Sequence, residues 1–174
     1  GTICKNVKIL SYQDTYYSNN NGGKYYWEDS EIHGTVDFLC GGGDVYYNRC
    51  KFVVEKRSAD GKGGCTIAAP YTDGSKWGYV MNECVVDNYA ETFNYGRAWG
   101  GTPRLAYLNT TLLQPDMIIK DRFTVGGMNV PADKFVEFNT KDAQGNVVSP
   151  ASNVLKITKD NKVNEMETIL TADQ

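Results

Sequence analysis

The chain has 174 residues, 12 of them tyrosine and 18 glycine, with a net charge of −3 and an isoelectric point near 5.2. This length suits one domain with one sizeable core. The apolar residues come in short runs that are too short to span a membrane, and the acidic balance argues against a nucleic-acid-binding surface. The composition therefore favours an all-β globular or solenoid protein.

Five similar segments follow one another along the first two thirds of the chain. Each has a polar residue followed by a period-two alternation, which indicates a strand and not a helix turn. Short repeats that are separated by insertions of variable length are typical of a parallel β-helix, in which each turn of the chain, or rung, pairs with the next. We therefore expect a single all-β domain over 1–174, with core rungs in 1–113 and the last strands and a tail in 114–174. The segments are KNVKIL, WEDSEI, YNRCKF, MNECVV and LNTTLL, with Asn6, Glu28, Asn48, Asn82 and Asn109 at the shared polar position and Leu10 and Ile32 at a shared apolar one.

The remaining segments are assigned more coarsely. The gap between Asn48 and Asn82 is rich in glycine and charge and is expected to hold one further irregular rung plus loops. Downstream, FVEFNT predicts a strand, KDAQGN a turn, and SPASNVLKIT an edge or loop. After Asp160, apolar residues recur at helical spacing, which predicts a short amphipathic C-terminal helix that caps the solenoid. Those residues are Val163, Met166, Ile169 and Leu170.

The cysteines and the single histidine limit the chemistry. Five cysteines with no CxxC pair and one histidine do not make a zinc site. One disulfide among Cys50, Cys65 and Cys84 is compatible with the count, but buried free thiols are the preferred interpretation. A serine–histidine–aspartate triad would depend on His33 alone, and no GxSxG is present. We expect His33 on a loop or rung edge, outside any catalytic site.

Two aspartates stand at related places in the repeat. Asp14 lies four residues after Leu10, and Asp37 lies five after Ile32. Stacked rungs would therefore bring the two carboxylates to about one strand spacing, ~4.8 Å. Carboxylates this close disfavour simultaneous ionisation, which suits one nucleophile or base and one general acid.

Arg97 and Trp99 supply what such an aspartate pair would need. A guanidinium beside Asp37 would keep it ionised and oriented, although an arginine–aspartate pair can also be purely structural. The indole of Trp99 offers a flat apolar face for a sugar ring. Trp27 and Trp77 are instead expected to be packing residues and not sugar platforms.

Three ordered motifs carry a resemblance to a known family. YQDTYY, GTVDFLCGGG and YGRAWG resemble the signature segments of pectin methylesterases (pectinesterases, carbohydrate esterase family 8), whose patterns read roughly QDTLY, GxVDFIFG and LGRPW. The resemblance runs from about residue 3 to 113, and FVEFNT is similar to a further segment of the family. It implies a right-handed parallel β-helix that demethylates pectin (methyl-esterified homogalacturonan), releases methanol and needs no cofactor or metal. It also implies a secreted, periplasmic or cell-surface location.

The resemblance further implies a role for each matching residue. Asp37 is similar to the nucleophile of the family, and Asp14 to its acid/base. Apart from the resemblance, the acidic isoelectric point leaves Arg97 and Lys24 or Lys76 to meet the charges of a uronate. The remaining roles fall to Gln13 as the oxyanion-hole amide, Arg97 as the residue that orients the nucleophile, and Trp99 and Tyr17 as substrate-binding aromatics.

This sequence also departs from the family pattern. Ala98 replaces a proline, Cys40 replaces a phenylalanine, and no glutamine precedes Gln13, where the family has a second one a rung earlier. We therefore expect a C-terminal fragment without the first rungs, whose exposed β-helix end is prone to self-association. The alternative interpretation is a catalytically impaired pectinesterase-like β-helix that binds polysaccharide or serves as a structural domain.

Overall fold

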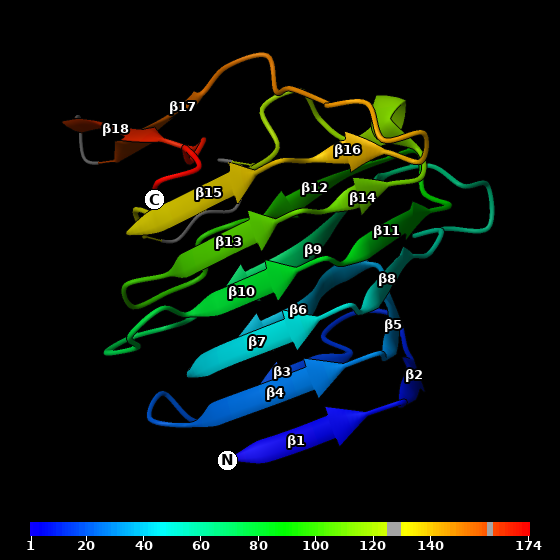
Figure 1. Ribbon diagram of the computed structural model, residues 1–174, viewed down its shortest axis with the longest axis horizontal. Helices are drawn as coiled ribbons and strands as arrows, with labels where there is room; N and C mark the ends of the chain where they lie inside the picture. The colour runs from blue at the N-terminus through cyan, green and yellow to red at the C-terminus, as the bar shows by residue number, and fades with distance from the viewer. Residues whose placement is uncertain (125–129, 160–161) are drawn as a thin grey trace.

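The computed structural model describes residues 1–124, 130–159 and 162–174, and in it the chain coils through three stacked parallel sheets (Figure 1). Each of the first four turns of the coil contributes one strand to each sheet, the last two turns contribute strands to two of the sheets only, and each turn lies on top of the one before it. The one helical element within these described residues is a single 3₁₀ turn at Pro115–Met117. The all-β parallel β-helix expected from the repeat is confirmed.

Sheet A runs the full height of the stack and forms its front in Figure 1. Its strands alternate inward and outward side chains, as in Tyr79–Asn82, where the first and third residues are buried and the others half-buried. From the N-terminal end, the strands are β1 (Thr2–Lys5), β4 (Lys24–Glu28), β7 (Asp44–Asn48), β10 (Tyr79–Asn82), β13 (Arg104–Leu108) and β15 (Lys134–Phe138).

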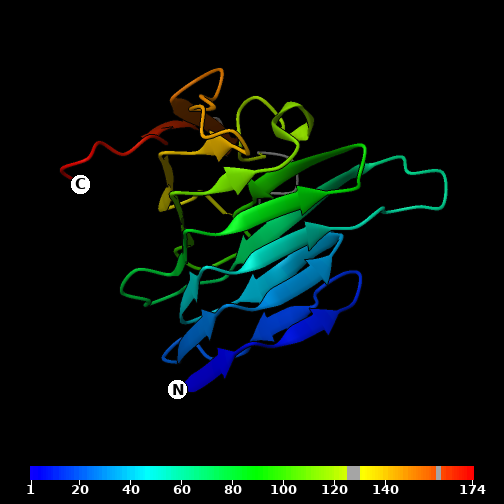
Figure 2. The same cartoon turned by 45° about the vertical axis from the view of Figure 1, so that its right-hand side comes forward.

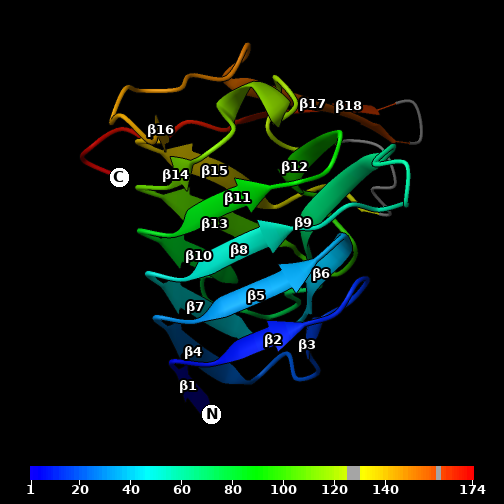
Figure 3. The same ribbon diagram turned by 90° about the vertical axis from the view of Figure 1, so that its right-hand side faces the viewer.

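Sheet B faces the viewer in Figure 3, and sheet C lies beside it. The strands of sheet B are β2 (Lys8–Leu10), β5 (Glu31–Gly34), β8 (Lys51–Val54), β11 (Val85–Asn88), β14 (Thr111–Leu112) and β16 (Lys141–Asp142). The strands of sheet C are β3 (Tyr16–Ser18), β6 (Val36–Gly41), β9 (Gly64–Pro70) and β12 (Thr92–Gly96).

Aromatic side chains fill the interior and stack from rung to rung. Trp27, 4% exposed, lies over Tyr47 with ring centroids 6.4 Å apart, and Tyr95 stacks on Tyr107 at 3.8 Å. These rings bury large apolar areas, so they contribute much of the hydrophobic stabilisation. Trp27 thus packs inside, as expected of a packing residue, whereas Trp77, of which packing was also expected, is 41% exposed.

The repeat was found correctly, but its register is wrong by one residue at three of the five positions. The bend between sheets A and B requires a left-handed residue in every rung, and Asn6 and Asn109 occupy that place. In the rungs between them the left-handed residue follows the predicted one, and Ile32 pairs with Ile9 and not with Leu10. The left-handed column is Asn6, Asp29, Arg49, Glu83, Asn109 and Asn139, each with φ between 49° and 56°.

The predicted frame instead followed a ladder of asparagine amides. Asn82 donates to the side-chain oxygen of Asn48 at 3.1 Å, Asn109 donates to Asn82 at 3.3 Å, and Asn139 to Asn109 at 2.8 Å. This ladder crosses from one backbone position to the next between Asn82 and Asn109, because Asn82 pairs with Leu108. A pattern of polar side chains therefore located the rungs without fixing their register.

The segment between Asn48 and Asn82 does not add a rung. It supplies β8 and β9 of the third rung, and two loops lengthen that rung (Figure 2). Loop 55–63 joins sheet B to sheet C, and loop 71–78 joins sheet C to sheet A. The extra residues therefore form these two loops on the outside of the β-helix.

The predicted C-terminal helix is also wrong. Residues Val154–Lys159 (β17) and Lys162–Glu167 (β18) form an antiparallel hairpin over the C-terminal end of the stack, with Leu155 paired to Met166. The segment could bury Leu155 and Met166 on one face by pairing with a second strand, and such pairing outweighs local helical spacing. Of the other apolar residues of the predicted helix, Val163 is 59% exposed and Ile169 is 39% exposed.

Candidate active site

Asp14 and Asp37 lie one above the other at the bend from sheet B to sheet C. Tyr16 pairs with Leu39 in the two rungs, and the backbone N–H of Asp14 donates to the carbonyl of Val36 at 3.2 Å. Both aspartates adopt left-handed backbone conformations, with φ of 51° and 53°. Aspartate tolerates this region better than most residues, and such conformations cluster at functional sites.

A bulge in β6 explains how an apolar run carries an outward-facing Asp37. Val36 pairs with Thr66 but Leu39 pairs with Ala68, so β6 has one extra residue at this point. A bulge re-aims a side chain, and here Phe38 is fully buried while Asp37 faces the outer surface. Gly34 makes room, because a Cβ on it would lie 2.1 Å from that of Phe38.

Arg97 holds the Asp37 carboxylate by several hydrogen bonds. Its Nε lies 3.0 and 3.1 Å from the two carboxylate oxygens, and its Nη2 lies 2.7 Å from Oδ2. These hydrogen bonds to Asp37 raise the pKa of Arg97 above its usual value, and the nearby Asp14 contributes to the increase. Asp37 is 5% exposed, so the fork fixes an anion that would otherwise be costly to bury.

A pocket of about 190 Å³ opens above this pair. Gln13 and Asp14 form one side of it and both are exposed, so their polar groups are accessible to a ligand. The sequence reasoning singled out five of the seven lining residues. The full lining is Gln13, Asp14, Asp37, Cys40, Ala69, Arg97 and Trp99.

Cys40 forms part of the floor. Burial is the main cause that raises the pKa of its thiol to about 12, and the nearby Asp14 and Asp37 and a hydrogen bond with Asp14 contribute to this shift. The thiol therefore stays protonated and acts as a weak hydrogen-bond donor beside the two carboxyl groups. All five cysteines are free in the structure, so the disulfide compatible with the sequence is not formed.

An adjoining hollow of about 410 Å³ shares Trp99 with the pocket. Trp99 contacts two exposed tyrosines: its ring centroid lies 6.2 Å from that of Tyr17 and 5.6 Å from that of Tyr71. Ala98, which precedes Trp99, is fully buried. The backbone N–H of Trp99 donates to the carbonyl of Pro70 at 3.3 Å, so the position of the indole is fixed although the family's proline is replaced by Ala98. Flat faces of this kind suit a sugar chain.

The sequence reasoning missed Tyr71 and the Asn19–Asn21 loop, which also line the hollow. They lie outside the repeat, in connections whose course no period predicts. The one available signal for Tyr71 was an aromatic residue after the proline that ends β9.

His33 lies elsewhere, on strand β5 and not on a loop. Its ring nitrogens contact Glu31 at 2.5 Å and Glu55 at 2.6 Å on the outer face of sheet B. Among residues 1–124, 130–159 and 162–174, no cluster of histidine, cysteine and acidic side chains could hold a metal ion, and no helix is long and apolar enough to cross a membrane.

The fold and the site define a parallel β-helix protein that has a carboxylate pocket and exposed aromatic rings on its outer face. The family model for pectinesterase matches residues 1–128. This chain therefore belongs to the pectinesterase family.

Individual relatives agree with that assignment. A pectinesterase of Sitophilus oryzae is 29% identical over 136 residues, which cover 71% of this chain and 35% of that protein. Putative pectinesterase 11 of Arabidopsis thaliana is 32% identical over 100 residues, covering 57% of this chain and 26% of the relative. The chain thus spans about a third or less of the length of these relatives.

Solved structures resemble this chain over nearly all of its length. A pectin methylesterase in complex with a hexasaccharide has a TM-score of 0.69 at 26% identity, covering 99% of this chain and 53% of its own. Pectin methylesterase PemA from Erwinia chrysanthemi has a TM-score of 0.68 at 25% identity with the same coverage.

Proposed function

We propose that this protein hydrolyses the methyl esters of pectin and releases methanol. The observation that carries the proposal is the Asp37 carboxylate, held by Arg97 at the floor of a pocket that also contains Asp14 and Gln13. The relatives are named pectinesterases, and a methylated galacturonate offers the ester carbonyl that such a carboxylate can attack.

In the first half-reaction an Asp37 oxygen attacks the C6 carbonyl carbon of a methylated galacturonate. The amide of Gln13 donates to the oxyanion as the tetrahedral intermediate forms. The bond to the methoxyl oxygen then breaks, and that oxygen takes a proton from Asp14 to leave as methanol. The product on the enzyme is an acyl anhydride with Asp37.

In the second half-reaction Asp14, now a carboxylate, removes a proton from water. The resulting hydroxide attacks the acyl carbon, the bond to Asp37 breaks, and a free galacturonic acid leaves. Asp37 regains its charge, which Arg97 stabilises, and Asp14 regains its proton. No step needs a metal or cofactor.

The aromatic residues would bind the polysaccharide. Trp99 and Tyr17 present ring faces beside the pocket, and Tyr71 extends this surface over the adjoining hollow. Action on a cell-wall polymer requires a secreted, periplasmic or cell-surface location, which is part of this proposal. The proposal includes self-association through edge strands β1, β2 and β3, where Ile3 is largely exposed.

Methanol release from highly methylated pectin tests the proposed activity. Asp37→Asn keeps the size and backbone preference of the residue but removes the nucleophile, so release should fall by at least about 10⁴-fold. Gln13→Ala removes one oxyanion donor and should lower kcat by about 10²–10³-fold with little change in KM. Release that is unchanged in Asp37→Asn would exclude this mechanism.

The second candidate function is polysaccharide binding without turnover. The exposed aromatic surface of Tyr17, Tyr71 and Trp99 favours it independently of the carboxylates. A wild-type chain that binds pectin in a pull-down assay yet releases no methanol, alone or extended upstream by several rungs, would support this alternative.

A further inference from the structure

The corner where sheet C turns into sheet A carries a cluster that the proposed reaction does not use. Two segments that line the 410 Å³ hollow, Asn19–Asn21 and the loop beginning at Tyr71, continue along the chain to this corner. They end beside each other, because the Nζ of Lys24 lies 5.7 Å from the ring centroid of Trp77. Lys76 also lies over this ring, with its Nζ 5.4 Å from the centroid. We name Lys24, Lys76 and Trp77 the corner cluster.

Asp44 holds the corner cluster in one geometry. Its carboxylate accepts hydrogen bonds from the backbone N–H groups of Lys76 at 3.3 Å, Trp77 at 2.8 Å and Gly78 at 2.9 Å. Arg104 adds a hydrogen bond from Nη1 to the carbonyl of Lys76 at 2.6 Å. The loop is therefore fixed on both sides, and the indole is presented without an ordering cost at binding.

The chain reverses sharply behind the indole. Gly78 has φ of 74°, and a Cβ there would lie 2.5 Å from the carbonyl oxygen of Arg104. Only glycine fits this approach, so the position of Trp77 is built into the backbone.

The two ammonium groups of the corner cluster are not neutralised by carboxylates. In the part of the chain that the structure describes, no ion pair involves Lys24 or Lys76, and both side chains are exposed. Lys5 offers a contrast: it lies 5.8 Å from the ring centroid of Tyr26, but it also pairs with Glu28 at 3.1 Å. The corner cluster thus combines an exposed ring with two uncompensated charges in an otherwise acidic protein.

This combination matches a sugar that carries a carboxylate. The apolar face of a pyranose ring can lie against the indole, while the carboxylate accepts hydrogen bonds from the ammonium groups. A methyl ester has no charge to offer these lysines. The chemistry therefore distinguishes a free uronate from its ester.

We propose that the corner cluster is a second carbohydrate-binding site, specific for de-esterified galacturonate residues. The identification of the anion as galacturonate rests on the proposed function, since that reaction converts esters to uronates. A pectin chain lying across the hollow would reach this site with residues that have already lost their methyl groups. The site would then favour binding next to de-esterified stretches.

Binding measured without turnover tests this proposal. Every protein in this comparison carries Asp37→Asn, so that methylated pectin is not converted during the measurement, and the Asp37→Asn chain is the reference. The dissociation constants for polygalacturonate and for highly methylated pectin are compared at low ionic strength, by affinity electrophoresis. The Lys24→Gln/Lys76→Gln double variant should bind polygalacturonate about three- to tenfold more weakly and methylated pectin less than twofold more weakly. The difference should shrink near 1 M salt, where charges are screened within about 3 Å.

Two further variants sharpen the test. Lys5→Gln is the matched control, because it removes one lysine that also lies over an aromatic ring, and it should leave both dissociation constants unchanged. Trp77→Ala should weaken binding of both polymers, because it removes the ring face that either sugar can use.

Several outcomes would overturn the proposal. These are an Asp37→Asn reference that does not bind polygalacturonate, a double variant that binds it as tightly as this reference, and an equal loss for both polymers. A loss of the same size in Lys5→Gln would indicate a general charge effect and would overturn it too. Because the assay needs no catalysis, methanol release can fail while the charge-specific binding remains, so the two proposals are separable.

Discussion

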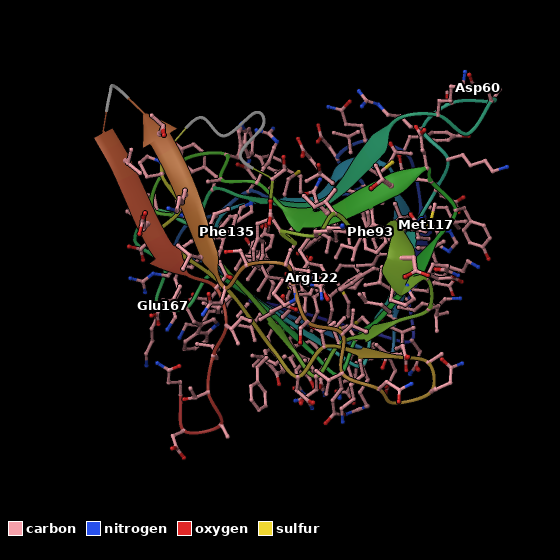
Figure 4. All side chains as sticks on the ribbon, turned by 90° about the horizontal axis from the view of Figure 1, so that it is seen from above. Asp60, Phe93, Met117, Arg122, Phe135 and Glu167 are labelled. Atoms are coloured by element: carbon pink, nitrogen blue, oxygen red, sulfur yellow. The ribbon has the colours of Figure 1, made fainter. Side chains whose placement is uncertain are left out.

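Two arginine–carboxylate pairs in this molecule have similar contacts and different surroundings. Arg122 and Glu137 lie inside the stack, with side chains only 3% and 4% exposed, and Figure 4 shows Arg122 in the interior near Phe93 and Phe135. Arg97 and Asp37 lie under the pocket on the outer face, with side chains 19% and 7% exposed.

The interior pair is satisfied from every side. Arg122 donates from Nε to Glu137 at 3.0 Å and from Nη2 to the carbonyl of Val148 at 2.6 Å, and Thr140 donates to Glu137. Burial still raises the pKa of Glu137. Glu137 pairs in register with the inward-facing residues of the lower rungs. Its carboxylate therefore stands at a position that apolar or aromatic side chains occupy in those rungs, namely Trp27, Tyr47, Met81 and Tyr107.

An arginine–carboxylate contact does not by itself indicate a catalytic role. The pair on the outer face adjoins a pocket, a second aspartate and a glutamine amide, so a substrate can reach its carboxylate. The interior pair contacts protein on all sides and can only stabilise the fold. Breaking each pair should therefore affect different measurements.

The largest expected difference comes from removing one acid of each pair. Glu137→Ala leaves Arg122 buried and unpaired, so the free energy of unfolding should fall by about 3–5 kcal/mol. Asp37→Asn should change it by about 1 kcal/mol or less, since asparagine keeps the left-handed conformation and can accept from Arg97. Urea unfolding followed by tryptophan fluorescence measures both.

Activity should show the opposite order. Methanol release per folded molecule should be lost in Asp37→Asn and kept within about threefold in Glu137→Gln. The double variant Arg122→Met/Glu137→Leu should recover most of the stability lost in Glu137→Ala, because no charge remains buried. A Glu137→Ala variant as stable as wild type would show that the interior pair does not stabilise the fold, and would contradict the structural role assigned to it.

A smaller effect concerns the thiol beside the outer pair. Because the pKa of Cys40 is raised to about 12, only about 10⁻⁴ of it is thiolate at pH 8, and iodoacetamide should label it far more slowly than the half-exposed Cys4. Asp14→Ala removes the side chain that forms a hydrogen bond with the thiol and should speed Cys40 labelling by about three- to tenfold, as read by peptide mass spectrometry. Equal rates in both proteins would mean that Asp14 does not influence Cys40.

The smallest effect belongs to an exposed ionic cluster on sheet B. Hydrogen bonds from Lys8 and His33 lower the pKa of Glu31 to about 2. The stabilisation is therefore present above the ordinary glutamate value, near pH 4.5, and is lost as the pH falls toward 2. Glu31→Gln should cost less than about 1 kcal/mol at pH 7, and this difference should vanish near pH 2 in urea titrations. A difference that persists at pH 2 would contradict a charge effect.

The sequence indicated the rungs better than the register. Alternating apolar residues and recurrent asparagines located five rungs, because inward packing and amide ladders repeat with every turn. The one-residue shift at Glu28, Asn48 and Asn82 arose because the backbone bend, not side-chain polarity, sets the pairing. The offset that separated Asp14 from Asp37 in the predicted frame disappears in the observed register, where Leu10 pairs with His33.

The C-terminal part shows that local spacing of apolar residues does not reveal which segments pair as strands. Helical spacing at Val163 and Met166 was real, but β17 offered a partner that no local pattern reveals. Similarly, the exposure of Trp77 depends on Asp44, 33 residues away in sequence, which captures its backbone.

The sequence by itself determined the repeating strands, the interior aromatic residues and the motifs that contain Gln13, Asp14, Asp37, Arg97 and Trp99. Those features depend on local alternation and on residue types that chemistry restricts. Only the tertiary structure decided which arginine contacts which carboxylate, that a bulge turns Asp37 outward, and that the corner cluster assembles from two distant loops. The physical reason is that stacking of rungs brings distant residues together, and hydrogen-bond register, not sequence distance, sets their geometry.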